Sequence, residues 1–187
     1  MDRASANAGV AGGGRAAVVA GRLYVVGGTF GVTPALSRRS FSYDLRTGRW
    51  SAFPGVPQPR EHLGAAALDG RVYVLGGRTA AERFRRADGW DVRLRRWVRL
   101  PDMPTARGGT SATARAGTVV SIGGESSAGT NREVESFDPE TRRWRQLRPL
   151  PEGRHGLGVA AVGRRLYALL GGPRPGLSVS AAVFVLP

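Results

Sequence analysis

The chain has no cysteine among its 187 residues, so disulfide bonds, thiol catalysis and thiolate metal sites are excluded. It has no lysine either: all 28 basic residues are arginine, and with 14 acidic residues the net charge is +14. No apolar run approaches the roughly 18 residues of a membrane span. The N-terminal segment MDRASANAGVAGGG lacks the apolar stretch of a signal peptide. The compartment stays open, with the cytoplasm as the default, and neither a cofactor nor a metal is expected.

The positive charge raises the question of nucleic-acid binding, because an electropositive surface attracts phosphate. The sequence offers no helix with a basic stripe and no aromatic-rich strand that resembles an RNA platform. Many arginines fall at predicted turns, where a solvated charge is ordinary: Arg95–Arg96, Arg142–Arg143 and Arg164–Arg165. Arginine in place of every lysine is also typical of a GC-rich genome. We therefore do not expect a nucleic-acid partner.

Three short motifs recur along the chain at intervals of about 47 residues. A glycine pair follows an apolar run, a tryptophan stands by itself, and an arginine follows proline by three positions. The glycine pairs end YVVGG (24–28), YVLGG (73–77), VSIGG (120–124) and LLGG (169–172); the tryptophans are Trp50, Trp97 and Trp144; the Pro-x-x-Arg motifs end at Arg60, Arg107 and Arg154. A fixed period of this length indicates one supersecondary unit that is stacked repeatedly.

One repeat, about residues 60–100, has the pattern of four strands. HLGAAAL (62–68) is small and apolar, Asp69-Gly70 is a two-residue hairpin turn, and RVYVLGG (71–77) is β-branched and aromatic. GWDV (89–92) and RWVRL (96–100) follow as a third and a fourth strand. Four antiparallel strands per unit, repeated radially, form a β-propeller blade.

The turn between the third and fourth strands also repeats. Each turn begins with an aspartate, whose carboxylate can accept hydrogen bonds from backbone N–H groups two residues on. Each closes with a tryptophan, which we expect to be mostly buried between adjacent blades. The pairs are Asp44 with Trp50, Asp91 with Trp97, and Asp138 with Trp144.

Together these motifs resemble kelch repeats, over about residues 11–185, and GGESSAGTNREVESFDPETRRW resembles the last blades of bacterial kelch proteins. The resemblance implies an all-β, kelch-type β-propeller with four blades. We expect the repeats at about 11–53, 60–100, 107–147 and 154–187, and a disordered or loosely held N-terminus at 1–10. Rings of the resembling group usually have six blades in about 300 residues.

The chain departs from that pattern at both ends. Ala11 stands where the first repeat should have its arginine, and the last repeat stops without a tryptophan strand. Fifteen strands result, with an incomplete last blade. We expect a partial or open propeller, the C-terminal part of a larger ring; a four-bladed ring that closes on itself is the competing interpretation. Open strand edges would favour self-association.

Arg60, Arg107 and Arg154 are the main candidates for ligand binding. Each precedes an innermost strand, so blade symmetry should arrange them around one mouth of the channel. Kelch proteins of this kind often bind acidic peptides or sugars there, and guanidinium groups suit carboxylates. The alternative is that each arginine donates hydrogen bonds to loop carbonyls of its own or the next blade.

Glu125 and Asn131 complete the candidate site, in a loop expected at the same rim. Glu125 is the one weak catalytic candidate, as a general acid or base resembling that of kelch-type sialic acid mutarotases. The alternative is a loop carboxylate paired with Arg132 or Arg154. His62 and His155 occupy inequivalent positions and make a poor metal site. Copper oxidases built on kelch propellers need a cysteine, which is absent here.

The sequence therefore favours a binding module over an enzyme. We expect a ligand or protein partner at the channel mouth or loops, either an acidic peptide or a carbohydrate. A carbohydrate-active enzyme of the mutarotase type is the alternative. It would use Glu125 together with the arginines.

Overall fold

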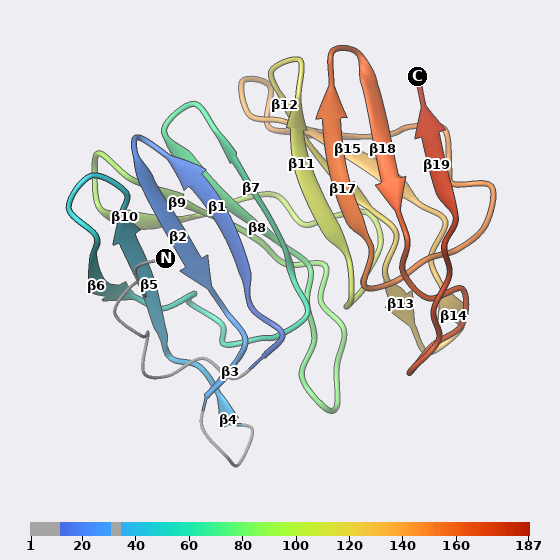
Figure 1. Ribbon diagram of the computed structural model, residues 1–187, viewed down its shortest axis with the longest axis horizontal. Coiled ribbons are helices and arrows are strands. Elements are labelled where there is room, and N and C mark those ends of the chain that lie inside the picture. Colours follow the sequence, from blue (N-terminus) through green and yellow to red (C-terminus); the bar gives the residue numbers. More distant parts are fainter. Residues whose placement is uncertain (1–11, 31–34) are drawn as a thin grey trace.

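The computed structural model describes residues 12–30 and 35–187. The N-terminal segment 1–10, expected to be loosely held, lies outside the described residues, as does Ala11. Within the described part all regular structure is β, which confirms the all-β propeller. Of the 19 strands found in these two ranges, fifteen form four sheets arranged radially (Figure 1), and the other four form two short hairpins. No helix in these two ranges is long and apolar enough to cross a membrane.

Each blade is an antiparallel sheet in which the first strand of the repeat lies nearest the channel and each later strand lies farther out. Blade 1 contains β1 (Arg15–Val19), β2 (Arg22–Val26), β5 (Arg39–Asp44) and β6 (Arg49–Pro54). Blade 2 contains β7 (Gly64–Leu68), β8 (Arg71–Leu75), β9 (Ala87–Asp91) and β10 (Arg96–Arg99). Blade 3 contains β11 (Ser111–Arg115), β12 (Thr118–Ile122), β15 (Val134–Asp138) and β16 (Arg143–Gln146). In the part of the chain that the structure describes, blade 4 consists of β17 (Gly158–Val162), β18 (Arg165–Leu169) and β19 (Val183–Leu186), which confirms the incomplete last blade.

The hairpins extend the loops between second and third strands. They are β3 (Thr29–Phe30) with β4 (Ala35–Leu36), and β13 (Glu125–Ser126) with β14 (Gly129–Thr130). Both lie at the end of the molecule where the chain enters each innermost strand, at the bottom of Figure 1. We call this end the mouth.

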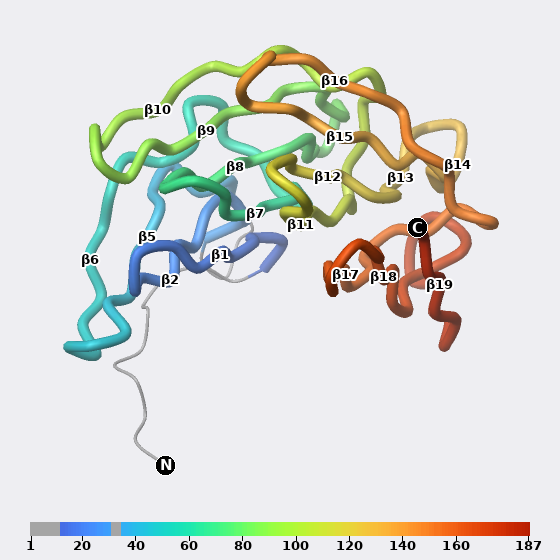
Figure 2. The backbone as a smooth tube through the Cα atoms, turned by 90° about the horizontal axis from the view of Figure 1, so that it is seen from above, coloured from blue at the N-terminus to red at the C-terminus, as the bar shows by residue number. Residues whose placement is uncertain are grey.

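The four blades form an arc. The innermost strands contact one another in the order β1, β7, β11, β17. Seen from above, blades 1 and 4 stand on either side of an opening (Figure 2). Three apolar clusters fill the seams between successive blades. In the middle seam, Tyr73 and Leu75 of blade 2 pack with Val119 and Phe137 of blade 3.

The glycine pair ends each second strand because the next blade approaches it closely. At Gly76 a Cβ would lie 2.7 Å from the backbone oxygen of Arg107, and at Gly123 it would lie 2.4 Å from that of Arg154. The following glycine, Gly77, donates its N–H to the same Arg107 oxygen at 2.9 Å. Both glycines have positive φ, which a side chain would strain. The pair is therefore a docking corner for the next blade.

Blade 4 departs from the expected motif at this corner. The left-handed pair is Leu170 (φ 61°) and Gly171 (φ 79°), whereas Gly172 is shifted on to the position of Glu125 in blade 3. The N–H of Leu170 donates to Ala182, as that of Gly123 donates to Glu133. Leu170 is 55% exposed, because among the described residues no next blade covers it.

The turn aspartates behave as expected. Oδ1 of Asp44 accepts from the N–H groups of Arg46 and Thr47 at 3.0 and 2.9 Å, and that of Asp138 accepts from Glu140 and Thr141. Asp91 accepts from Leu94 at 2.8 Å. These backbone hydrogen bonds lower the pKa of all three carboxyls.

All three tryptophans are at intermediate exposure, and Trp97 and Trp144 pack against the apolar clusters of the seams with the preceding blades, as expected. Their strands lie at the outer rim, where an indole covers the seam with one face and meets solvent with the other. Nε1 of Trp97 donates to the Pro54 oxygen of blade 1, and that of Trp144 donates to the Pro101 oxygen of blade 2, both at 2.9 Å. The equivalent Nε1 of Trp50 is buried and has no acceptor among the described residues.

Candidate functional site

Arg60 lies inside blade 2 and not on its surface. The residue is 0% exposed, and its Nε donates to the Gly76 oxygen at 2.7 Å. Its Nη2 forms an ion pair with Asp88 at 3.0 Å, and both side chains are fully buried. Burial lowers the pKa of Arg60 to about 10, although Asp88 opposes the shift. These contacts hold the second and third strands of the blade together.

Arg107 occupies the equivalent place in blade 3. Its Nη2 donates to Oε2 of Glu135 at 2.6 Å, and its Nη1 donates to the Glu133 oxygen at 2.9 Å. Burial lowers the pKa of Arg107, against the pull of Glu135 and Glu133. Glu135 also accepts from the hydroxyl of Thr105 at 2.6 Å, so this buried carboxylate is well satisfied.

Arg154 repeats the arrangement in blade 4 with weaker partners. Its Nη2 donates to Glu152 at 2.8 Å and to Ser180 at 3.3 Å, and its guanidinium lies 5.1 Å from the centre of the Phe184 ring. All three motif arginines therefore point into protein, which favours the interpretation of structural ties. One donor remains on two of them: Nε of Arg107 and of Arg154 has no hydrogen-bond partner among the described residues.

The mouth instead carries a cluster of ionisable side chains. Its first member in the sequence directly follows the first motif arginine, Arg60. We call Glu61, His62, Arg78, Glu125 and His155 the mouth cluster. Arg78 donates through Nε to Oε1 of Glu61 at 3.2 Å and through Nη1 to Oε1 of Glu125. His155 Nδ1 lies 3.8 Å from the other oxygen of Glu125. The chain of contacts runs from blade 2 through blade 3 to blade 4.

The backbone beneath the cluster is continuous across the blades. The N–H of His62 donates to Gly13, that of Gly109 to His62, and that of Gly156 to Gly109, at 2.7, 2.7 and 2.8 Å. All four residues have positive φ, including His62 at 51°. The ladder fixes the innermost strands relative to one another, so the side chains of the cluster are held by a rigid frame. Burial and the charge of Arg78 lower the pKa of His62, although Glu61 opposes the shift.

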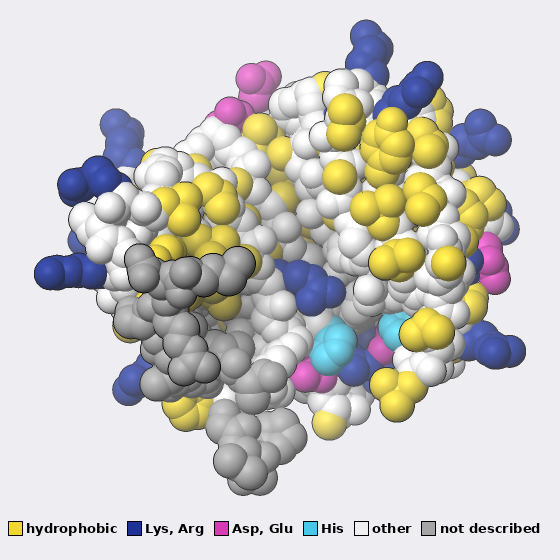
Figure 3. All heavy atoms as spheres, viewed as in Figure 1, with side chains coloured by type: hydrophobic (Ala, Val, Ile, Leu, Met, Phe, Trp, Pro, Cys, Tyr) yellow, Lys and Arg dark blue, Asp and Glu magenta, His cyan; other side chains and the backbone are white. Residues whose placement is uncertain are grey.

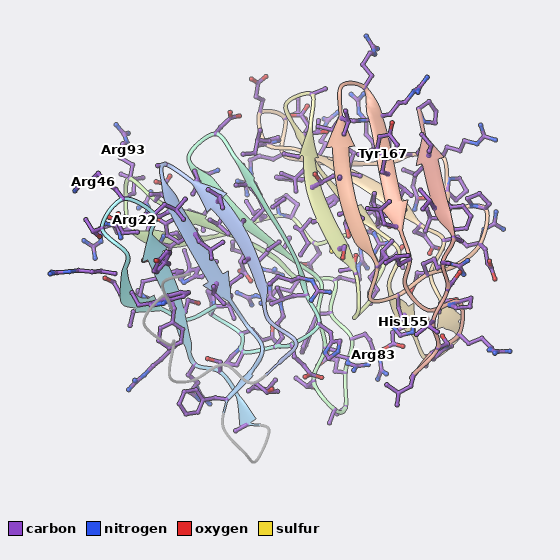
Figure 4. The ribbon with its side chains drawn as sticks, in the orientation of Figure 1. Arg22, Arg46, Arg83, Arg93, His155 and Tyr167 are labelled. Carbon is purple, nitrogen blue, oxygen red and sulfur yellow. The ribbon has the colours of Figure 1, made fainter. Side chains whose placement is uncertain are left out.

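Two further arginines add positive charge at this end. Arg15 begins β1, and burial lowers its pKa. Arg83 lies in the loop between β8 and β9, and its buried Nε has no partner among the described residues. Figure 4 places Arg83 and His155 at the mouth end, away from Arg46 and Arg93 on the opposite turns. Histidine, acidic and basic side chains gather in the hollow between the two halves of the arc (Figure 3).

Glu125 and Asn131 both lie at this end, as expected, but with different partners. Glu125 is 4% exposed, and it pairs with Arg78 and not with Arg132 or Arg154. Asn131 is 9% exposed; its Nδ2 donates to Glu133 at 3.1 Å, and its Oδ1 has no partner among the described residues. Arg78 was missed by the sequence interpretation. The signal was present, since Arg78 and Glu125 each follow a glycine pair, 47 residues apart.

A separate hollow of about 380 Å³ lies between blades 1 and 2, on the side away from the mouth. Its lining includes Tyr24, Phe53, Trp90 and Arg22. Arg22 is already paired with Asp44 at 2.7 Å. The mouth cluster, which has unsatisfied donors beside it, is therefore the better candidate site.

Comparison with known proteins gives consistent matches to kelch repeats. The family model of the KLHDC2/KLHL20/DRC7 Kelch-repeats domain matches residues 7–172. Among curated proteins, a 61-residue segment is 38% identical to kelch repeat and BTB domain-containing protein 13 of Mus musculus, over 33% of this chain. A 56-residue segment is 38% identical to an F-box/kelch-repeat protein of Arabidopsis thaliana, over 30% of this chain.

The matched segments are short relative to those proteins, at 13% of the mouse protein and 16% of the plant protein. Among solved structures, that of YjhT aligns with a TM-score of 0.77 and 21% sequence identity. The alignment covers 94% of this chain and 62% of YjhT. At this identity the likeness shows the fold alone.

Proposed function

The chain belongs to the kelch-repeat domain family, and we propose that it is a binding module whose mouth cluster holds an acidic segment of a protein partner. The observation that carries the proposal is the position of Arg78. This guanidinium lies at the centre of the cluster, is 24% exposed, and faces carboxylates from two blades. A partner carboxylate that approaches it would extend an arrangement of charges that is already in place.

The acidic character of the partner is inferred from the donors that lack acceptors. Near the mouth, Nε of Arg83, Arg107 and Arg154 is unsatisfied among the described residues; so are Asn131 Oδ1, an acceptor, and His62 Nδ1, which donates or accepts according to its tautomer. Arg107 and Arg154 are buried, so of these three donors the ligand can reach that of Arg83. An unsatisfied buried donor costs roughly 1–3 kcal/mol, so a ligand that supplies an acceptor there is favoured. The net charge of +14 also attracts a negatively charged partner over distance.

Binding fits this site better than catalysis. A general acid or base needs a proton-exchanging atom that faces the substrate. Arg78 occupies Oε1 of Glu125, and His155 lies toward Oε2. The mutarotase-type alternative would need Glu125 to leave these partners before it could act, and no described contact favours that.

The proposal can be tested with labelled hexaglutamate, and with hexa-arginine and a Gly-Ser hexamer as comparison peptides. Fluorescence anisotropy at low salt should detect binding of hexaglutamate only, and affinity should fall as salt is added. Arg78→Gln should weaken binding about tenfold, which equals about 1.4 kcal/mol. Arg93→Gln removes the same charge from an exposed turn at the other end and should change affinity less than twofold. Equal losses in both variants, or no binding of hexaglutamate, would contradict the proposal.

A further inference from the structure

The hollow of about 380 Å³ between blades 1 and 2 shares no lining residue with the mouth cluster. Three of its lining residues, Tyr24, Ser42 and Ser51, form one row across blade 1, since Ser42 of β5 lies opposite Tyr24 of β2 and Ser51 of β6. Trp90 of blade 2 lines the hollow from the other side. A volume of this size falls within the range of about 300–1,000 Å³ that is usual for small-molecule pockets.

The hydroxyl groups of this row lack hydrogen-bond partners among the described residues. Tyr24 and Ser42 are 5% and 6% exposed, and neither they nor Ser51 form a side-chain hydrogen bond with another described residue. Each hydroxyl can donate one hydrogen bond and accept others. Because two of the three side chains are almost fully withdrawn from bulk water, a polar ligand in the hollow would supply hydrogen bonds that they otherwise lack.

Two guanidinium groups from different blades flank the row. Arg22 begins β2 of blade 1, and Arg95 lies in the turn between β9 and β10 of blade 2. Burial raises the pKa of Tyr24, and the charges of both arginines oppose the shift, so both act on the same hydroxyl. Asp44 pairs with Arg22 and offsets its charge, whereas Arg95 is exposed and forms no ion pair among the described residues. Arg95 therefore supplies the net positive charge of the hollow.

The comparable place between blades 2 and 3 shows how the hollow arises. Gly89 of blade 2 stands 47 residues after Ser42, at the same position in its blade. A Cβ at Gly89 would lie 2.7 Å from Cδ of Arg71, so the Arg71 side chain lies across this position. In blade 1 the Cβ of Ser42 occupies the place, and the corresponding Arg22 cannot fill it.

A second difference lies on the outermost strands. Val98 of β10 stands 47 residues after Ser51 of β6, and it packs against the apolar cluster that fills the seam between blades 2 and 3. Ser51 is smaller than valine and is exposed. Serine in place of glycine and of valine therefore leaves this part of the seam between blades 1 and 2 both open and polar.

The groups around the hollow match a phosphate group. Guanidinium groups donate paired N–H bonds to phosphate oxygens, and hydroxyl groups donate single ones. The phosphate of a monoester offers three acceptor oxygens, whereas a carboxylate offers two. Beside the polar row, Phe53 and Val92 give the hollow an apolar wall, which suits a ring.

We propose that the hollow binds a small phosphomonoester whose phosphate group is attached to a ring. The phosphate group lies between Arg22 and Arg95 and accepts hydrogen bonds from the hydroxyl row, and the ring packs against Phe53. The site is separate from the mouth cluster, so it binds its ligand whether or not the mouth holds an acidic segment.

Isothermal titration calorimetry of the full chain with phenyl phosphate, at physiological salt, tests the proposal. One molecule should bind per chain. Phenylacetate, which keeps the ring but carries a carboxylate, and inorganic phosphate, which lacks the ring, should each bind about tenfold more weakly. Benzylamine should not bind. The proposal is overturned if phenyl phosphate does not bind, or if any of the three comparison ligands binds as tightly.

Three variants locate the binding. Ser51→Val gives blade 1 the residue that blade 2 has at this place, so it should fill the hollow and weaken binding of phenyl phosphate at least tenfold. Arg95→Gln should weaken binding about tenfold. Arg142→Gln is the matched control, because Arg142 is also exposed and stands 47 residues after Arg95, with a φ of 56° against 52°. It should change the affinity less than twofold.

The variants also state what would overturn the proposal. Equal losses in the two arginine variants would show that the ligand is held by diffuse attraction to positive charge. An unchanged affinity in folded Ser51→Val would place the ligand outside the hollow. Thermal unfolding checks that each variant is folded, and Arg95→Gln, in an exposed turn, decides the case if Ser51→Val does not fold.

Discussion

The buried arginines and the mouth cluster lie close together in the sequence, since Glu61 of the cluster directly follows Arg60. The two sets differ in burial and in their partners. Arg60 is 0% exposed and bound to Asp88 and to backbone oxygens, whereas the neighbouring Glu61 is half-buried and pairs with Arg78 at the surface. The period of the repeat brings both sets to the same end of the propeller. Burial separates them: the inner set stabilises each blade, and the outer set is where we propose that a ligand binds.

The largest expected effect comes from breaking the inner set. Arg107→Ala leaves Glu135 buried without its charged partner, and loss of one member of a buried ion pair costs about 3–5 kcal/mol. Urea unfolding should show this loss in the free energy of unfolding. Replacing both residues, as Arg107→Met with Glu135→Leu, should recover most of it; if it does not, the pair has a role beyond mutual compensation.

Substitutions in the glycine pair that ends the second strand should change the stability in opposite directions in two blades. Gly123→Ala should destabilise by about 1–3 kcal/mol, because φ is positive and the new Cβ meets the Arg154 oxygen. Leu170→Gly should stabilise by about 0.5–1 kcal/mol, since it relieves a left-handed leucine that no described blade covers. Thermal unfolding of both variants checks the pair, and a destabilised Leu170→Gly would show that the leucine side chain makes a contact the fold needs.

A smaller cost is expected in the outer set. Arg78→Gln removes two charge-assisted hydrogen bonds from a partly exposed side chain and should lower the free energy of unfolding by about 1–2 kcal/mol. The variant should fold, with an unchanged circular dichroism spectrum, and lose affinity for acidic peptide. A cost as large as that of Arg107→Ala would place Arg78 among the structural ties.

The smallest effect concerns pH. The pKa of His62 is lowered, so protonation favours the unfolded chain. The corresponding stability is present above the unfolded value of about 6.5 and is lost as pH falls below it. Denaturant unfolding at pH 7.5 and 5.5 should show a decrease that His62→Asn reduces, since asparagine tolerates the positive φ. The carboxyls of Asp44, Asp91 and Asp138 have lowered pKa values, so the stability they contribute is present at both of these pH values and is lost only at more acidic pH. If the free energy of unfolding of the variant decreases as much as that of the native chain, a group other than His62 causes the pH dependence.

Much of the fold could be predicted because the period fixes it. Four blades, fifteen blade strands and a three-stranded last blade follow from repeated positions. The site was harder, since sequence position gives the place of a side chain around the channel but not its depth. Arg60 and Glu61 are adjacent in the sequence, yet only burial against Asp88 decides that the arginine faces inward. Leu170 shows the same limit: the visible Gly171-Gly172 pair hid a shift of one residue that only the backbone conformation reveals.

We propose that a ligand binds at the mouth cluster and not at the buried arginines. Arginine modification by phenylglyoxal, read by mass spectrometry with and without hexaglutamate, tests it most directly. Arg46 and Arg93 should react in both conditions, whereas Arg60, Arg107 and Arg154 should react in neither. Arg78 and Arg83 should react in the free protein and be protected by the peptide. Protection of Arg46 and Arg93 to the same degree, or reaction of Arg60 and Arg107 in the folded protein, would contradict the account.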